Sequence, residues 1–261
     1  MFIPPSNKWQ GRNYQKDRLR AEIWSLLKKQ NICQRNPQGH IPNFKGCEKA
    51  AENLAGLSIW QKANVIKCNP DSPCMPIRLR ALQDGKCLYM AVPQLKTRRC
   101  FVELTAENLQ KRSICLEEAA IAQKALSYGR LVSFEEMQPI DLVTVGCVAV
   151  TRNGGRMGKG AGFADLELAM LAELNLITGI TPIVTAIHPL QIVENSRLLM
   201  EAHDWPLNWI ITPFEVIETQ TIYPRPQGLN KEMIRSEQYE TMPILRDWKE
   251  AGWVMKPNQN C

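Results

Sequence analysis

The chain has 261 residues, of which 44% are hydrophobic and 22% charged, and its formal net charge is +6. This length and composition indicate one large globular domain, or a domain with an appended segment, and exclude a disordered or low-complexity protein. The longest apolar stretches, such as 142–150, are shorter than the roughly 18–20 residues of a membrane-spanning helix. The first residues show no apolar segment followed by a cleavage site of small residues. We therefore expect a cytoplasmic protein with no membrane partner.

The cysteines and the net charge further narrow the classes of protein that fit this sequence. The sequence has nine cysteines and no C-x-x-C pair, which argues against a zinc ribbon or a thioredoxin-like motif and favours reduced thiols. The positive net charge suits an anionic ligand such as a nucleotide or a polyglutamate tail. RNA binding fits the same charge, but no RNP-like aromatic motif is present. We therefore do not expect a nucleic-acid partner.

Helices and strands alternate in the first half of the sequence. Apolar residues recur every three or four positions in 16–30, which predicts an amphipathic helix. Short apolar runs bounded by turn residues predict strands. The elements that follow are a helix at 48–60, a strand at 65–68, a helix at 77–83 and a strand at 87–92.

The second half continues the alternation and sets the fold class. Its elements are a helix at 117–126, a strand at 141–150, a helix at 163–174, a strand at 183–187, a short helix near 196–201 and a strand at 208–212. Strands of this kind, apolar on both faces, are typical of a parallel sheet between helices. We expect a Rossmann-like α/β fold with three layers, α/β/α, and a mostly parallel central sheet.

The composition changes near residue 223, where Pro, Gln, Lys and Asn become frequent and the periodicity fades. We expect a single α/β domain over 1–222, including the N-terminal helix, and a C-terminal appendage over 223–261 with at most one or two helices. No internal repeat is visible.

A glycine-rich segment carries the strongest chemical signal. Residues 153–165 read N-G-G-R-M-G-K-G-A-G-F-A-D and lie between a predicted strand and a predicted helix. Glycines let the backbone approach a phosphate closely, and a helix N-terminus offers unpaired N–H groups to anions. The segment 158–162 is G-x-G-x-G, which matches neither the dinucleotide fingerprint nor the phosphate loop of nucleotide triphosphatases. The alternative to a phosphate cradle is a flexible connection without a ligand. The residues predicted to bind phosphate here are Arg156, Gly158, Lys159, Gly160, Ala161 and Gly162.

Two carboxylates are candidates for a metal. Asp165 falls in the first turn of the predicted helix, where the helix dipole also stabilises negative charge. Asp204 precedes the predicted strand at 208–212. One or two carboxylates beside nucleotide phosphates are how proteins hold Mg²⁺. The sequence therefore predicts a Mg²⁺ site at Asp165 and Asp204.

Several segments together resemble the 5-formyltetrahydrofolate cyclo-ligase family, also called methenyltetrahydrofolate synthetase. The matching features are K-x-x-L-R at 16–20, Gly85-Lys86, the segment 141–165, His203-Asp204 and the residues 210–212. The similarity extends over about 16–219. It is strongest to the paralogous branch of methenyltetrahydrofolate synthetase domain-containing proteins, through 65–76, 88–95, 145–165 and 181–187.

The resemblance implies a cyclo-ligase fold and a Mg²⁺-dependent ring closure at the expense of ATP. Members of the family convert 5-formyltetrahydrofolate to 5,10-methenyltetrahydrofolate. The resemblance implies ATP-binding roles for Lys16, Arg20 and the loop at 156–162, with Arg156 and Lys159 as its catalytic cations. It also implies Mg²⁺ ligation by Asp165 and Asp204, and it makes Phe163 the one aromatic platform for substrate that this sequence keeps. Trp205 is a second candidate for substrate binding, because an aromatic ring beside Asp204 offers a surface for a pterin or an adenine. The expected partner is a small reduced folate, and the expected oligomeric state is a monomer.

The sequence departs from the family pattern mainly on the folate side. Where cyclo-ligases read G-Y-Y-D-R, residues 162–166 read G-F-A-D-L, so Ala164 replaces one aromatic ring. A-V-T at 149–151 replaces A-F-D, and P-D-S-P-C at 70–74 replaces an acidic E-x-x-T segment. Two hypotheses remain. The first is a cyclo-ligase. The second is a nucleotide- or folate-binding paralog without that activity, in another cofactor pathway such as thiamine metabolism.

Overall fold

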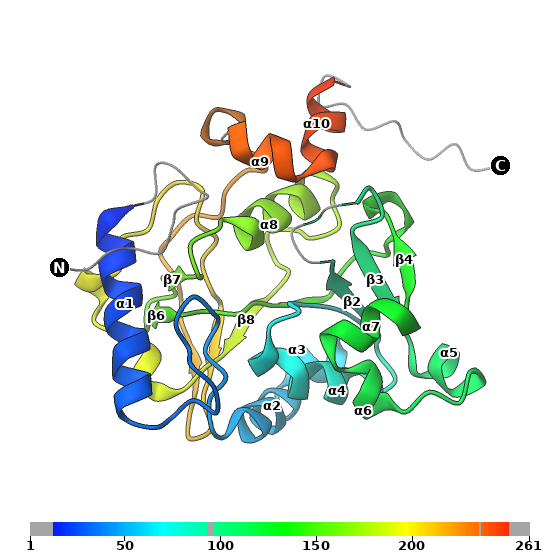
Figure 1. Ribbon diagram of the computed structural model, residues 1–261, viewed down its shortest axis with the longest axis horizontal. Coiled ribbons are helices and arrows are strands. Elements are labelled where there is room, and N and C mark those ends of the chain that lie inside the picture. The colour runs from blue at the N-terminus through cyan, green and yellow to red at the C-terminus, as the bar shows by residue number, and fades with distance from the viewer. Residues whose placement is uncertain (1–12, 93–94, 96, 235, 251–261) are drawn as a thin grey trace.

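The computed structural model describes residues 13–92, 95, 97–234 and 236–250 (Figure 1). Eight of the described strands form one large sheet in the order β11-β10-β8-β5-β1-β2-β3-β4. In chain order these strands are β1 (Val65–Cys68), β2 (Cys87–Ala91), β3 (Phe101–Leu104), β4 (Arg130–Val132), β5 (Leu142–Thr144), β8 (Ile183–Ala186), β10 (Trp209–Ile211) and β11 (Val216–Glu218).

The middle of this sheet is parallel. β10, β8, β5, β1 and β2 all run in the same direction. β11 at one edge pairs antiparallel with β10, and at the other edge β3 pairs antiparallel with both β2 and β4. The predicted α/β class with a mostly parallel central sheet is confirmed. Sequence periodicity did not predict β3 or β4. β3 lies between the predicted strand 87–92 and the predicted helix 117–126, and β4 follows that helix.

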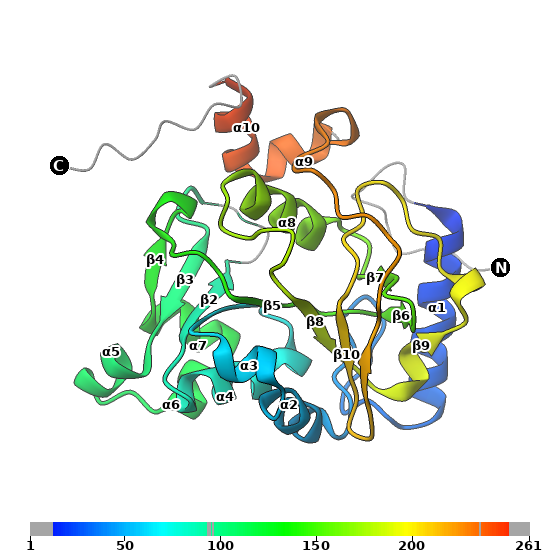
Figure 2. The same ribbon diagram turned by 180° about the vertical axis from the view of Figure 1, so that it is seen from behind.

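Helices cover both faces of the large sheet (Figures 1 and 2). One face packs against α2 (Cys47–Ala55), α3 (Ser58–Lys62), α4 (Met75–Gln83), α5 (Ala106–Lys111), α6 (Leu116–Ala119) and α7 (Ala122–Tyr128), and the other against α8 (Phe163–Glu173), α9 (Ser236–Thr241) and α10 (Pro243–Glu250). Successive residues of a strand point to opposite faces, so Leu88 joins one core cluster and Tyr89 the other. None of the helices that the structure describes is long and apolar enough to span a bilayer.

The predicted strand at 141–150 is wrong as a single element. β5 ends at Thr144, and the chain leaves the large sheet before β6 (Ala149–Thr151), which pairs with β7 (Arg156–Met157) and β9 (Ile192–Val193) in a second sheet. Gly146 lies between them, where a Cβ would come within 3.0 Å of both Asp71 and Ile41. Both segments are buried, Thr144 included, so no exposed residue within 142–150 marks the break.

The small sheet is covered by α1 (Tyr14–Lys29), the predicted N-terminal helix. Its apolar stripe, including Leu19, Ile23 and Leu27, packs against Val148 and Ala149. The side chain of Asn13 caps the helix by accepting from the backbone N–H of Lys16 (3.1 Å). The amphipathic pattern therefore places this helix correctly to within two residues.

Three predicted helices differ in detail. The helix expected at 48–60 is divided into α2 and α3 because Leu57 is extended (φ −83°, ψ 147°). The one expected at 117–126 is divided into α6 and α7 at Ile121, which is also extended. The short helix expected near 196–201 is a single 3₁₀ turn over Asn195–Arg197.

The segment after residue 223 packs on the same core as the rest of the chain. Ile244, Leu245 and Trp248 of α10 are buried in the cluster that contains Phe134, whose ring centroid lies 5.9 Å from that of Trp248. Its helices lie over α8 (Figure 1). The division at 222/223 stays a prediction, and the outermost parts of the two predicted units, 1–12 and 251–261, fall outside the described residues.

Candidate active site

A cavity of about 520 Å³ lies where the two sheets meet. Its walls come from α1, the loop 158–162, the start of α8 and the residues that follow β1. Ligands of parallel α/β sheets bind at the carboxyl ends of the strands, which is where Asn69 and Asp71 leave β1. The cavity is therefore placed as the fold class predicts.

The glycine loop forms one wall. Gly160 (φ +102°) and Gly162 (φ +73°) adopt the left-handed backbone region, which other residues enter only with strain. Gly162 also precedes the first turn of α8, and in the described structure no side chain caps that helix. The loop therefore brings bare backbone and a helix N-terminus to the cavity, as a phosphate site needs.

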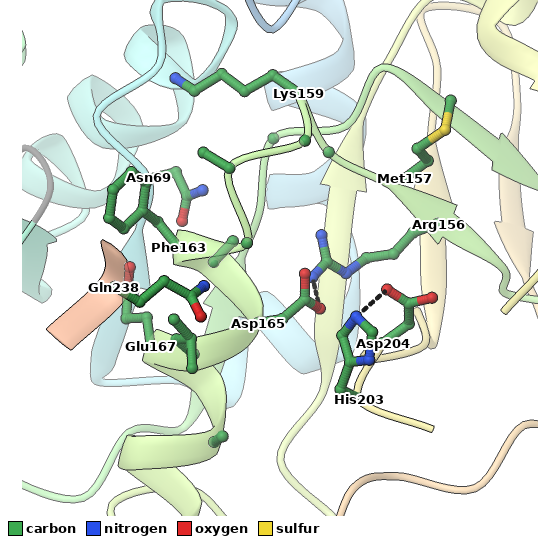
Figure 3. A pocket seen from close by; sticks show the side chains of 18 of the residues that line it. Asn69, Arg156, Met157, Lys159, Phe163, Asp165, Glu167, His203, Asp204 and Gln238 are labelled. Atoms are coloured by element: carbon green, nitrogen blue, oxygen red, sulfur yellow. Dashed lines mark hydrogen bonds and ion pairs between the residues drawn. The ribbon is translucent and has the colours of Figure 1, made fainter. Parts of the chain in front are cut away.

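Arg156 projects from β7 beneath this loop and is only 2% exposed (Figure 3). Its Nε donates to the carbonyl oxygen of Trp205 (2.7 Å), and its Nη2 pairs with Asp165. The buried Nη1 has no hydrogen-bond partner among the residues that the structure describes. A Cβ added at Gly158 would lie 4.0 Å from this nitrogen, so Nη1 faces the glycine loop. A buried cationic N–H that protein groups leave unpaired is suited to an anionic ligand.

Charge keeps Arg156 in place. Burial alone would lower the pKa of its guanidinium, but the carboxylates of Asp165 and Asp204 outweigh this effect and raise the pKa. Asp165 also accepts from the backbone N–H of Trp205 (3.0 Å). In this structure Asp165, predicted as a metal ligand, orients the arginine and fixes the segment at 205.

The two predicted aromatic residues have different surroundings. Phe163 lines the cavity and is partly exposed. The side chain of Trp205 is 2% exposed, packs in the hydrophobic core and is not among the residues that line the cavity. The structure therefore brings only Phe163 to a position where it can stack on a ligand.

Lys16 and Arg20 face the cavity from α1 and are already paired. Lys16 Nζ donates to Glu201 Oε2 (2.7 Å) and also pairs with Asp204. Arg20 Nε donates to the carbonyl oxygen of Gly158 (2.7 Å). Both cations line the cavity and hold the glycine loop and the turn at 201–204 against α1. Their role in binding ATP stays a prediction.

The fourth predicted cation, Lys159, lies at the tip of the glycine loop with 42% of its side chain exposed. Its Nζ donates to Asp71 Oδ1 (3.0 Å) across the cavity mouth. The loop is therefore tied both to α1 and to the residues after β1.

A group suited to a metal ion forms on the turn 201–204. Glu201, His203 and Asp204 each offer a ligand atom, and these atoms lie within 4.8 Å of one another. Burial would raise the pKa of Glu201, but the hydrogen bond from Lys16 outweighs it and lowers the pKa, so the carboxylate is ionised near neutral pH. The sequence analysis identified Asp204 and missed Glu201 and His203. The spacing E-x-H-D in 201–204 is the signal that could have revealed them.

Sequence reasoning also missed buried polar residues in the cavity wall. Lys67, fully buried, forms an ion pair with Glu167 and donates to Asn69 Oδ1 (2.5 Å). Gln238 of α9 is 6% exposed and lines the cavity. Lys67 and Glu167 belong to no motif and lie one hundred positions apart, so no local pattern predicts that they meet.

Comparison with known proteins decides the family. The model of the 5-formyltetrahydrofolate cyclo-ligase family matches residues 12–213. The chain belongs to the 5-formyltetrahydrofolate cyclo-ligase family. This confirms the resemblance inferred from the motifs. The cavity residues 228, 229, 230, 234 and 238 lie beyond the part that the family model matches.

Individual relatives agree with this assignment. The chain is 37% identical over 233 residues to the methenyltetrahydrofolate synthase domain-containing protein of Bos taurus. It is 36% identical over 233 residues to the protein of that name from Homo sapiens, and each alignment covers 88% of this chain. It spans about three fifths of the length of these relatives (61% and 60%). The solved Aquifex aeolicus 5,10-methenyltetrahydrofolate synthetase shares the fold, with a TM-score of 0.51, 18% identity, and coverage of 84% of this chain and 99% of that one.

Proposed function

We propose that this protein is an ATP- and Mg²⁺-dependent 5-formyltetrahydrofolate cyclo-ligase that forms 5,10-methenyltetrahydrofolate. The observation that carries the proposal is the buried Arg156, whose Nη1 faces the glycine loop with no partner among the described residues. A site that leaves such a donor unpaired is built for an anion, because a buried unsatisfied polar group costs about 1–3 kcal/mol or more when charged. Family membership makes the triphosphate of ATP the anion that we expect.

The chemistry suits a site that mainly positions its ligands. A formamide oxygen is a poor leaving group, and ATP supplies a phosphoryl group that turns it into a good one. Closure of the ring then joins N10 to the formyl carbon and releases the oxygen as phosphate. The task of the protein is to hold phosphates and folate in line and to exclude water. In this proposal Arg156 and the backbone of 158–162 hold the phosphates, and Lys159 contributes a further positive charge; all of these residues line the cavity.

The residues present fit Mg²⁺ as well as ATP. Mg²⁺ takes oxygen ligands, usually one or two carboxylates together with phosphates and waters. Asp204 and Glu201 offer such oxygens, and the ammonium of Lys16 now pairs with both. In this proposal the ion neutralises phosphate charge beside Asp204. In this proposal Asp165 orients Arg156 through their ion pair and does not ligate Mg²⁺ directly.

The test is direct. The purified protein is incubated with Mg·ATP and 5-formyltetrahydrofolate while the near-ultraviolet absorbance of the methenyl product is followed. Product formation that needs ATP, Mg²⁺ and Arg156 together supports the proposal. Absence of product from a protein that still binds ATP would refute it.

A second function is favoured by one feature of the same cavity. Ala164 lines it where cyclo-ligases present a second aromatic ring, so the stacking surface for a folate is smaller. This favours a nucleotide- or folate-binding paralog without ring-closing activity, acting in another cofactor pathway. ATP binding without product in the assay above is the result that this second function predicts.

A further inference from the structure

A pair of buried charges lies in the cavity wall, on the side away from Arg156 and Asp204 in the close view (Figure 3). Glu167, on α8, is 4% exposed and lines the cavity, and Oε1 of its carboxylate pairs with the ammonium of Lys67 on β1. Lys67 in turn donates to Asn69 Oδ1 (2.5 Å). Within the described part of the chain, the buried Oε1 of Glu167 has no hydrogen-bond partner and meets Lys67 as an ion pair only.

Stability alone does not explain this pair. Taking two charges out of water costs several kcal/mol per ion, and apolar residues of similar volume often stabilise a fold as well or better. Lys67 is on the central strand of the sheet, where its neighbours Ile66 and Cys68 are fully buried hydrophobic residues. The pair does have one consequence that apolar residues could not provide. It holds a carboxylate in a fixed position at the wall of a cavity. Burial raises the pKa of Glu167, and the adjacent ammonium of Lys67 opposes this effect and favours the ionised form.

The neighbours of Glu167 define what such a carboxylate could bind. An ionised carboxylate only accepts hydrogen bonds, so its ligand must donate them. Phe163 offers an aromatic face, and Gln238 and Asn69 offer amides on the same side of the cavity (Figure 3). Gln238 is close to the glycine loop, since a Cβ on Gly162 would lie 3.2 Å from its Nε2. A flat heterocycle with two adjacent N–H donors satisfies all of these groups together.

We propose that Glu167, held in place by Lys67 and Asn69, binds the 2-amino-4-oxopyrimidine edge of a ligand ring. The ring N–H and the amino group of that edge donate to the two carboxylate oxygens, and Oε1 keeps its ion pair with Lys67 at the same time because each oxygen has two lone pairs. This edge occurs in reduced folates and in guanine nucleotides. Adenine lacks it, since it presents an acceptor nitrogen beside its amino group. The inference rests on the proposed function in that it assigns the folate ring to this end of the same cavity.

The experiment compares two ring fragments. Pterin carries the 2-amino group, whereas lumazine has an oxygen there that would face the carboxylate. Binding of each is titrated by fluorescence against the full chain. A charge-assisted hydrogen bond corresponds to roughly a tenfold to hundredfold effect. The parent should therefore bind pterin at least about tenfold more tightly than lumazine, and Glu167→Gln should abolish that preference while ATP affinity stays unchanged.

Further variants separate recognition from folding. Lys67→Met with Glu167→Leu removes both charges and leaves no unpaired one in the core, so it should fold and also show no preference. Glu215→Gln, which removes a carboxylate paired with Arg152 at a distant surface, should keep the preference. Thermal melts of each variant check that it is folded.

Two further titrations identify which ligand carries the 2-amino-4-oxopyrimidine edge. Preference for 5-formyltetrahydrofolate that depends on Glu167 supports a folate, and preference for guanosine over xanthosine that depends on Glu167 supports a guanine nucleotide. Equal affinity of the parent for pterin and lumazine, or no binding of any of these rings, overturns the inference. Loss of cyclo-ligase activity would not, since pterin discrimination is measured without turnover. A cyclo-ligase whose Glu167→Gln variant keeps the pterin preference would overturn the inference and leave the proposed function intact.

Discussion

Replacing Arg156 by lysine tests the phosphate end of the cavity. Lysine keeps the positive charge but has one nitrogen, whereas Arg156 uses Nε for the carbonyl oxygen of Trp205 and Nη2 for Asp165, and leaves Nη1 for a ligand. The loss of one charge-assisted hydrogen bond in a buried site costs about 1.5–3 kcal/mol. For a chain of this size that corresponds to a fall in Tm of roughly 3–12 °C.

The assay is thermal melting of parent and Arg156→Lys with and without Mg·ATP. At a ligand concentration of about 100 Kd, binding stabilises the parent by about 2.7 kcal/mol, or roughly 5–11 °C. The variant should lose most of this ligand-induced shift at the same concentration, because a single lysine nitrogen cannot reach both Asp165 and a phosphate. A variant that melts with the parent and shows the same shift would refute both the structural and the ligand-binding role.

Three more substitutions address other walls of the cavity. Asp204→Asn should lower Mg²⁺ affinity in a metal titration, and unchanged affinity would place the ion elsewhere. Lys159→Ala should weaken ATP binding more at low than at high salt, because this side chain is 42% exposed; a loss independent of salt would contradict a direct phosphate contact. Gly228 has φ +112°, and a Cβ added there would lie 2.2 Å from Glu173 Oε2. Gly228→Ala should therefore displace the loop at 228–230, which lines the cavity, and weaken ligand binding. Unaltered affinity would exclude that loop from the site.

The parts of the fold that the sequence predicted are those with a local signal. The strand at 65–68 and the helix beginning at 163 agree with the structure because apolar pattern and turn residues mark their limits. The break after Thr144 could not be predicted, since the chain passes from one sheet to another without leaving the core. The antiparallel edge strands β3 and β4 were missed because the alternation rule describes only βαβ units.

The same distinction applies to the site. The loop at 158–162 and Arg156 carry a local motif, and both are at the cavity. The Lys67–Glu167 pair joins positions one hundred residues apart, so only the packing of α8 against β1 reveals it. The role of Asp165 as the partner of Arg156 also depends on the third dimension, because helix position alone suits a metal ligand equally well.

Ala164→Tyr measures how much the missing ring matters for folate. Ala164 lines the cavity next to Phe163, so a tyrosine there would restore a second aromatic face. An aromatic pair contributes about 0.5–1.5 kcal/mol beyond burial, which corresponds to roughly a twofold to tenfold gain in affinity for 5-formyltetrahydrofolate. The gain should be absent for ATP, whose phosphates we propose to bind on the Arg156 side of the cavity, and the ratio of the two affinities therefore removes any general effect of the variant on folding. Tight folate binding by the parent with no gain in the variant would show that Phe163, Glu167 and Gln238 already form a complete ring site, and that the smaller residue at 164 reflects a differently built wall.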